Sequence, residues 1–169
     1  IDRRHAPEIA QARAGEIATL TVTVDEHHVP RSPRQPYRVT CSDESGRITL
    51  TFFNGREDYL KKLLPIGEQR IVSGKVELYQ GEVQMTHPDH VVPLEQRDQV
   101  LRVEPVYGLT TGLTQKVVQK AIGAALERAP ELPEWQDPAF LARNRWAGWR
   151  SSLMQAHAPG EESDLAPDH

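Results

Sequence analysis

The sequence predicts a mainly β domain with one internal helix, followed by a small helical segment. Hydrophobic residues mostly alternate with polar ones from Gly15 to about Val92, which is the period of strands with one buried face. Helical spacing interrupts this alternation once, near residue 60, and takes over after Thr114. With 169 residues, of which 38% are hydrophobic, the chain is long enough to bury the core of about one domain.

The alternating region divides into five strand-like runs. In the first run, residues 15–24, aliphatic residues alternate with threonines, and we expect the strand to end at Asp25 and Glu26. Residues 27–36 contain three prolines, which cannot donate to a central ladder, and are predicted to form a long loop. The remaining strands are expected at 37–41, 48–53, 70–78 and 82–92.

One helix is expected between the third and fourth strands. Four apolar residues recur there at helical spacing, namely Tyr59, Leu60, Leu63 and Leu64. Pro65 and Gly67 end the pattern. Three strands, one helix and two strands form the plan of an OB-fold, a five-stranded, partly open barrel. Its first and last inter-strand loops, here 27–36 and 79–81, bind oligonucleotides or oligosaccharides.

The C-terminal part of the sequence predicts three helices. The first spans 114–129 and carries an apolar stripe of Leu113, Val117, Ala121 and Ala125. The second begins at Asp137 and Pro138, an acceptor cap followed by proline. The third spans 149–157, where Gly148 is a weak cap. We expect an OB domain at 1–108, a helical segment at 109–159 and a disordered acidic tail at 160–169.

The composition excludes several classes of protein. Twenty Lys and Arg against twenty-four Asp and Glu give a net charge of -4, which rules out a globally basic nucleic-acid binder but not a local basic patch. The single cysteine, Cys41, allows no intrachain disulfide and no cysteine-rich zinc site. No apolar run approaches the roughly 18 to 20 residues that cross a bilayer. We expect a cytoplasmic monomer with no membrane partner, and a piece of a longer polypeptide because the chain does not begin with Met.

No pattern in the sequence predicts catalysis. Gly74 and Lys75 are followed by Val76 and lack the upstream glycine of a phosphate-binding P-loop, so we expect no ATP hydrolysis by this chain and no catalytic residue. His87, Asp89 and His90 are of the types that bind metals, but no further cluster completes a tetrahedral set. We interpret them as a strand end, and expect neither a metal nor a cofactor in this chain.

The first loop is the strongest candidate for a phosphate contact. Between His27 and Ser42 the sequence contains no acidic residue but three arginines, Arg31, Arg34 and Arg38. Guanidinium groups bind phosphate oxygens through paired hydrogen bonds. The alternative, a proline-stiffened loop whose charges are merely solvated, is equally compatible with the sequence.

Phe53 is the candidate for stacking on a nucleic-acid base. Strand alternation directs Phe52 into the core and Phe53 to the other face, where an exposed ring would offer a platform for bases. Two alternatives would hide Phe53: the C-terminal helices cover it, or a bulge at Asn54 turns both rings inward. Tyr79, at the tip of the last hairpin, and Lys75, on its outward side, would extend the same surface.

Five runs of the sequence carry a resemblance to a known family. They are Leu50-Thr51-Phe52-Phe53-Asn54, Gly74-Lys75-Val76-Glu77, Gln84-Met85-Thr86-His87-Pro88-Asp89, Pro105-Val106-Tyr107 to Thr111-Gly112-Leu113, and Ala156-His157-Ala158-Pro159. Together they resemble the N-terminal wedge region of the RecG family. The family comprises ATP-dependent DNA translocases that regress stalled forks. The resemblance implies an OB-fold wedge at a DNA branch point, where aromatic residues stack on unpaired bases, with a motor that uses ATP and Mg further along.

The resemblance assigns roles residue by residue. It places Phe52 and Phe53 near the wedge tip, and Tyr59 is a candidate for the second stacking aromatic. Residues 109–159 would lead toward a motor that lies C-terminal to this chain. The leading hypothesis is a non-catalytic module, in the bacterial nucleoid, that binds forks, three-way or Holliday junctions, and single strands at the branch, for DNA repair and recombination. The alternatives are an OB-type protein adaptor and a generic single-strand binder.

Overall fold

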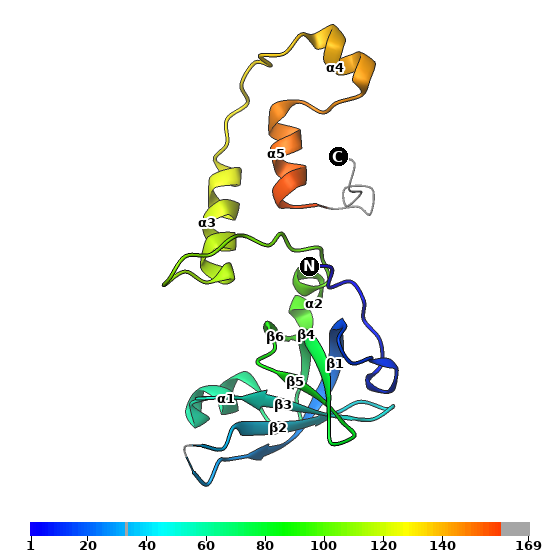
Figure 1. Cartoon of the computed structure of the whole chain (residues 1–169), viewed down its shortest axis with the longest axis vertical. Helices are drawn as coiled ribbons and strands as arrows, with labels where there is room; N and C mark the ends of the chain where they lie inside the picture. Colours follow the sequence, from blue (N-terminus) through cyan, green and yellow to red (C-terminus); the bar gives the residue numbers. More distant parts are fainter. Residues whose placement is uncertain (33, 160–169) are drawn as a thin grey trace. The chain divides into compact units, whose positions relative to one another are not determined.

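The computed structural model describes residues 1–32 and 34–159. It divides the chain into two compact units (Figure 1). One comprises Asp2–Arg102, and the other comprises Ile1 together with the residues from Val103 onward. The tail predicted at 160–169 lies outside the described residues, as does Pro33 of the first loop.

The first unit is built on one six-stranded sheet. Its strands are β1 (Ile17–His28), β2 (Tyr37–Ser42), β3 (Arg47–Phe52), β4 (Gln69–Tyr79), β5 (Glu82–Thr86) and β6 (His90–Pro93), with α1 (Glu57–Leu63) between β3 and β4. The strand order is β1-β2-β3-β5-β4-β6, and a further pairing of β1 with β4 closes a ring through five strands. β3 and β5 pair in parallel, whereas the other pairs are antiparallel. The predicted OB-fold is therefore confirmed.

Two strand boundaries differ from the prediction. β1 continues beyond Asp25 to His28, because a bulge between Val24 and Glu26 absorbs one extra residue. After the bulge His27 is partly buried, and its ring contacts the Tyr37 hydroxyl and the Leu64 carbonyl. The predicted fifth strand divides into β5 and β6, because His87 takes a positive φ of 46° and Pro88 follows it.

The hydrophobic core of this unit comes from the inward side chains of the ring. The fully buried residues from the strands include Leu20, Val22, Val39, Ile48, Leu50, Val72, Val76 and Met85. Leu60 and Leu64 of the α1 region join the same cluster. Tyr59 does not, since it is 62% exposed, so the predicted apolar stripe of α1 holds for its leucines only.

The N-terminal segment covers part of the outer face of the barrel. The buried Arg3 guanidinium donates to the Ser73 hydroxyl at 3.3 Å and pairs with Asp89 at 3.0 Å. The Thr19 hydroxyl donates to the Arg3 carbonyl at 2.8 Å and accepts from the Ser73 hydroxyl, also at 2.8 Å. The outer side of β1 and β4 is thus occupied by protein here. The 3-10 turn Ile9–Gln11 also belongs to this segment, and the turn Leu94–Gln96 leads into α2 (Arg97–Val100).

The second unit contains three helices close to the predicted positions. They are α3 (Gln115–Glu127), α4 (Pro138–Asn144) and α5 (Trp149–His157). Side chains of Thr114 and Asp137 cap the first two. Gly148 offers α5 no side-chain cap, but Glu134 accepts a hydrogen bond from the Trp149 amide at 2.6 Å and takes that role.

The predicted apolar stripe of α3 is wrong. Val117, Ala121 and Ala125 are exposed, whereas Leu126 is buried and Ile122 is partly buried. Val118, Ile122 and Leu126 form a second row at the same four-residue spacing, so spacing alone did not decide which side is covered. No helix among the described residues has the length and apolar character needed to traverse a membrane.

Gly74 is required where the turn after β5 crosses β4. A Cβ atom at Gly74 would lie 2.9 Å from the Met85 sulfur and 3.1 Å from the Pro88 Cα, both too close. We therefore expect Gly74→Ala to lower the free energy of unfolding by about 1 to 3 kcal/mol, measured by urea denaturation. Gly46→Ala is the matched control, because its Cβ would meet Ile9 at an ordinary 3.5 Å. Equal stability of the two variants would contradict the close approach at Gly74.

Candidate nucleic-acid interface

Phe53 projects from the barrel directly after β3. Phe52, the last residue of that strand, is 8% exposed and belongs to the core, whereas Phe53 is 52% exposed. This agrees with the alternation of the strand, and Asn54, with φ of 57°, turns the chain without drawing Phe53 inward. Only Phe53 of the pair is therefore accessible to a ligand, and Phe52 is not.

His87 lies against Phe53 at the end of β5. Its Nε2 accepts a hydrogen bond from the Phe53 backbone amide at 3.0 Å. The imidazole ring is tilted by 35° against the Phe53 ring, with 5.7 Å between centroids, and meets the Phe52 ring edge-on at 6.1 Å. The His87 amide in turn donates to the Thr51 carbonyl at 2.9 Å. The turn after β3 and the turn after β5 are thus joined by one hydrogen bond to a side chain and one hydrogen bond between backbone groups.

The outer face of β2, β3 and β5 carries two rows of polar residues. Cross-strand pairs connect His28, Arg38, Thr51 and Thr86 in one row and Glu26, Thr40, Thr49 and Gln84 in the next. Phe53 follows Thr51 by two residues and His87 follows Thr86 directly, so both lie at the end of the first row. We call the first row, with Phe53 and His87, the platform.

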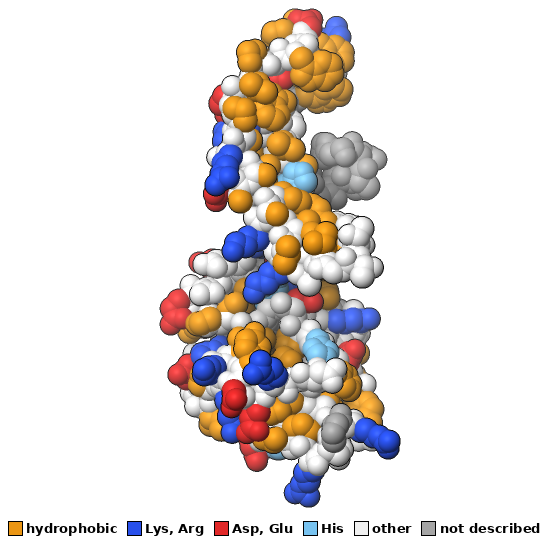
Figure 2. All heavy atoms as spheres, turned by 90° about the vertical axis from the view of Figure 1, so that its left-hand side faces the viewer, with side chains coloured by type: hydrophobic (Ala, Val, Ile, Leu, Met, Phe, Trp, Pro, Cys, Tyr) orange, Lys and Arg blue, Asp and Glu red, His pale blue; other side chains and the backbone are white. Residues whose placement is uncertain are grey.

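The three predicted arginines lie at the platform's end of the barrel. Arg31, Arg34 and Arg38 are all exposed, and none forms an ion pair with another residue of the described chain. The loop that carries Arg31 and Arg34 adjoins the platform because Tyr37, where β2 begins, pairs with Phe52, where β3 ends. Basic side chains project at the lower end of the barrel in Figure 2, the level of the β1–β2 connection in Figure 1.

Lys75 also lies level with the platform. It precedes Val76, whose partner is Met85, so the antiparallel register sets Lys75 opposite Thr86. The Lys75 side chain is exposed. Glu77, two residues on, accepts hydrogen bonds from the Thr86 hydroxyl at 2.8 Å and from the Gln84 amide at 3.2 Å. The positive charges therefore flank a polar face that also contains a carboxylate.

The two other predicted aromatics are exposed but are not part of the platform. Tyr79 is 54% exposed and pairs with Glu82 where β5 begins, whereas the platform lies where β5 ends. Figure 1 shows the β4–β5 hairpin and the β1–β2 connection on opposite sides of the barrel. Tyr59 of α1 makes no ring contact with Phe53 among the described residues.

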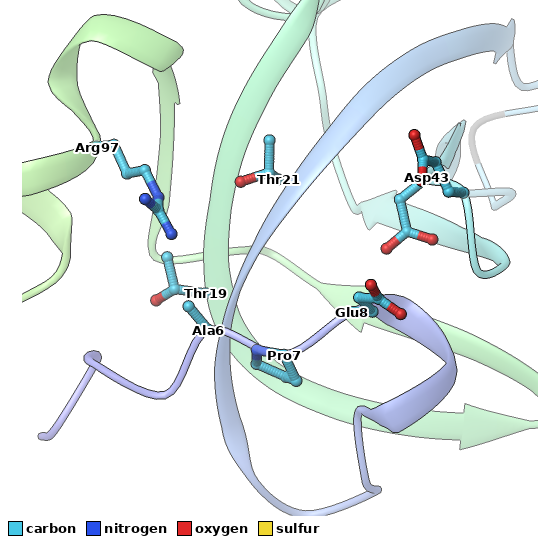
Figure 3. A pocket seen from close by; sticks show the side chains of 8 residues that line it. Ala6, Pro7, Glu8, Thr19, Thr21, Asp43 and Arg97 are labelled. Carbon is cyan, nitrogen blue, oxygen red and sulfur yellow. The ribbon is translucent and has the colours of Figure 1, made fainter.

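A pocket of about 230 Å³ lies elsewhere on the barrel, over the outer side of β1 (Figure 3). Its charged lining residues are Glu8, Asp43, Glu44 and Arg97, and Figure 3 shows Glu8 and Asp43 across the pocket from Arg97. The Asp43 carboxylate accepts hydrogen bonds from the backbone amides of Ile9, Ser45 and Gly46. This acidic, internally bonded site is unsuited to phosphate.

The described residues show no arrangement for metal or thiol chemistry. No group of three or more His, Cys, Asp or Glu among them is placed to hold a metal ion. His87 and Asp89, considered above as ligands, instead contact Phe53 and Arg3. Burial, and to a lesser degree the Asp25 carboxylate, raise the pKa of the Cys41 thiol to about 12.

Comparison with known proteins identifies the relatives of this chain. Residues 14–92 match the family described as OB-fold nucleic acid binding domain. The ATP-dependent DNA helicase RecG of Aquifex aeolicus is 26% identical over 96% of this chain and 22% of its own length. That of Acidithiobacillus ferridurans is 24% identical over 99% of this chain and 24% of its own length. Over nearly its whole length, this chain is similar to the RecG helicases.

A solved structure agrees with this relationship at the level of the fold. The structure of RecG bound to a three-way DNA junction matches with a TM-score of 0.83 and 24% identity, over 98% of this chain and 23% of that one. The resemblance is to the N-terminal OB-fold wedge region of RecG, as the sequence predicts. The chain spans less than a quarter of the length of the RecG proteins it matches.

His87 is the member of the platform whose role the sequence analysis missed. The residue types of His87, Asp89 and His90 suggest a metal site, and Pro88 suggests a strand end, but neither interpretation places His87 beside Phe53. The signal that would have found it is topological. In an OB-fold the parallel pairing of the third and fifth strands brings the residues after both strands to one place.

The two neighbouring phenylalanines give a test of the register. We expect Phe52→Ala to cost about 3 to 5 kcal/mol of unfolding free energy, since it truncates a core side chain. Phe53→Ala should change it by no more than about 0.5 kcal/mol, as for most exposed positions. Chemical denaturation of both variants measures this. A larger loss of unfolding free energy for Phe53→Ala than for Phe52→Ala would mean that Phe53, and not Phe52, faces the core.

Proposed function

We propose that this chain is a non-catalytic DNA-binding wedge module, which recognises branched DNA and separates strands at the branch for an ATP-driven motor. The observation that carries the proposal is the exposed Phe53 ring, held by His87 beside a basic loop. The similarity of the chain to RecG, whose structure was solved bound to a three-way DNA junction, suggests the class of substrate. ATP and Mg belong to the motor of the full-length protein, to which residues 109–159 lead.

The platform and the adjoining loop offer the two kinds of contact that a branch point requires. An aromatic ring stacks on any unpaired base, because every base has a π-face, and therefore favours a site where strands have separated. Guanidinium groups at Arg31, Arg34 and Arg38 bind phosphates on either arm regardless of sequence. Selectivity should then follow DNA structure and not base sequence.

A binding titration of the 169-residue chain tests the proposal directly. A fork, a three-way junction, a linear duplex and a single strand of matched length are compared at one salt concentration. We expect tighter binding to both branched DNAs than to the duplex. Equal affinity for fork and duplex, or preference for the single strand alone, would contradict a wedge. The second of these outcomes would favour a generic single-strand binder.

Removing the stacking ring should weaken binding without unfolding the protein. We expect Phe53→Ala to reduce the affinity for a three-way junction by about 1 to 3 kcal/mol, the value of one base stacked on an aromatic ring. Tyr79→Ala is the matched control, since Tyr79 is equally exposed but lies at the other end of β5. A larger effect from Tyr79→Ala would move the contact to the β4–β5 hairpin.

The arginines should contribute through counterion release. Replacing Arg31, Arg34 and Arg38 by Gln should flatten the dependence of log affinity on log salt by about two to three units, because each lost phosphate contact retains close to one counterion. Fork preference should survive. A control variant carries Lys116→Gln, Lys120→Gln and Arg128→Gln, three exposed cations outside the barrel unit. The same slope in both variants would mean that the loop is merely solvated.

Protein binding is the second candidate function. It is favoured by Leu78 and Tyr79, two exposed apolar residues that are consecutive in β4 and face opposite sides of the β4–β5 hairpin. An adaptor of this kind would show no preference among the four DNAs, and its binding to a protein partner need not vary with salt as DNA binding does.

A further inference from the structure

His87 is placed to control the Phe53 ring. Among the described residues, His87 alone has both a ring contact and a side-chain hydrogen bond to Phe53. The His87 backbone is held by one hydrogen bond, and a side-chain ion pair ties the chain two residues later. The His87 amide bonds the Thr51 carbonyl, and two residues later Asp89 pairs with the buried guanidinium of Arg3. The imidazole therefore extends from a fixed point toward a residue in an exposed turn.

The hydrogen bond determines the state of the imidazole. A backbone amide can only donate, so the Nε2 atom facing Phe53 must offer its lone pair. The bond seen here therefore requires the imidazole form whose proton is on Nδ1. In an imidazolium both ring nitrogens carry a proton, so the Nε2–H group would face the Phe53 N–H group and the hydrogen bond would be lost.

The left-handed backbone at His87 fits the same role. Its φ of 46° lies in a region that few side chains adopt, though histidine is among those found there more often. This conformation directs the chain away from β5 at the point where the ring must reach back to Phe53. Pro88 follows and restricts the turn further.

We infer that His87 is a positioning residue, which holds Phe53 in the orientation that stacks on a base. This inference rests on the proposed function. A ring ordered before binding loses less conformational freedom when a base stacks on it, and binding is stronger for that reason. His87 acts through the Phe53 amide and ring, and its contribution should vanish when Phe53 is absent.

The first part of the test needs no DNA. Two-dimensional NMR of the imidazole nitrogens should show the Nδ1–H tautomer for His87, and the Phe53 amide should exchange slowly with solvent. His87→Gln retains an acceptor at the distance of Nε2 and should keep that protection. His87→Phe retains a ring but has no acceptor and should lose it. The Nε2–H tautomer in the parent chain, or equal exchange in both variants, would overturn the inference.

The second part measures junction binding by variants that remain folded at the assay temperature. We expect His87→Phe to weaken binding by about 2- to 12-fold, the cost of ordering one side chain, and His87→Gln to restore most of the loss. In the Phe53→Ala background, His87→Phe should have no further effect. Additive losses would overturn the positioning role. If Phe53→Ala alone has no effect, the proposed function fails, while the NMR result still decides whether His87 holds Phe53.

Discussion

The parallel pairing of β3 with β5 is the contact on which the rest of the barrel depends. It consists of three cross-strand pairs, Thr49 with Gln84, Leu50 with Met85 and Thr51 with Thr86. Without it the ring through five strands stays open, and Leu50 and Met85, both fully buried, lose the cover of the opposite strand. Because the pairing ends at Thr51 and Thr86, the residues that follow both strands emerge together. The platform is therefore a consequence of barrel closure.

The runs of sequence that resemble RecG meet one another in the structure. Phe53 contacts His87 although they are 34 residues apart, and Gly74 accommodates Met85 and Pro88 from the same run as His87. In the second unit, the Tyr107 hydroxyl bonds His157 Nδ1 at 2.9 Å and their rings stack at 5.8 Å. A short run that is a weak sequence signal by itself thus supplies one side of a contact, and another run supplies the other side. Two runs together are a more specific signal, because the residues on each side of the contact must fit the other.

The fold could be predicted from local chemistry, whereas the composition of the site depends on pairing between distant residues. Alternation placed Leu50 and Phe52 inside and Phe53 outside, and cap residues such as Thr114 and Asp137 marked helix starts. The bulge after Val24 could not be seen, because Asp25 and Glu26 read as a strand end. The separation of Tyr79 from Phe53 follows from the register between β-strands, and the residue pattern within one β-strand does not contain that register. His87 was missed for the same reason.

On the proposed function, the charges of this unit would give weak DNA binding that becomes effective when the module is tethered. Three arginines and Lys75 near the platform can neutralise only a few phosphates, and Glu77 on the same face opposes close approach of the backbone. With a net charge of -4 the chain lacks the long-range attraction of a basic protein. A single stacking ring adds a modest, structure-dependent contribution. Covalent linkage to a larger DNA-binding protein raises the effective concentration of such a module without any new contact, because the second contact is then intramolecular. On the proposed function, the motor would keep the module on the DNA, and Phe53 would contribute where the strands part.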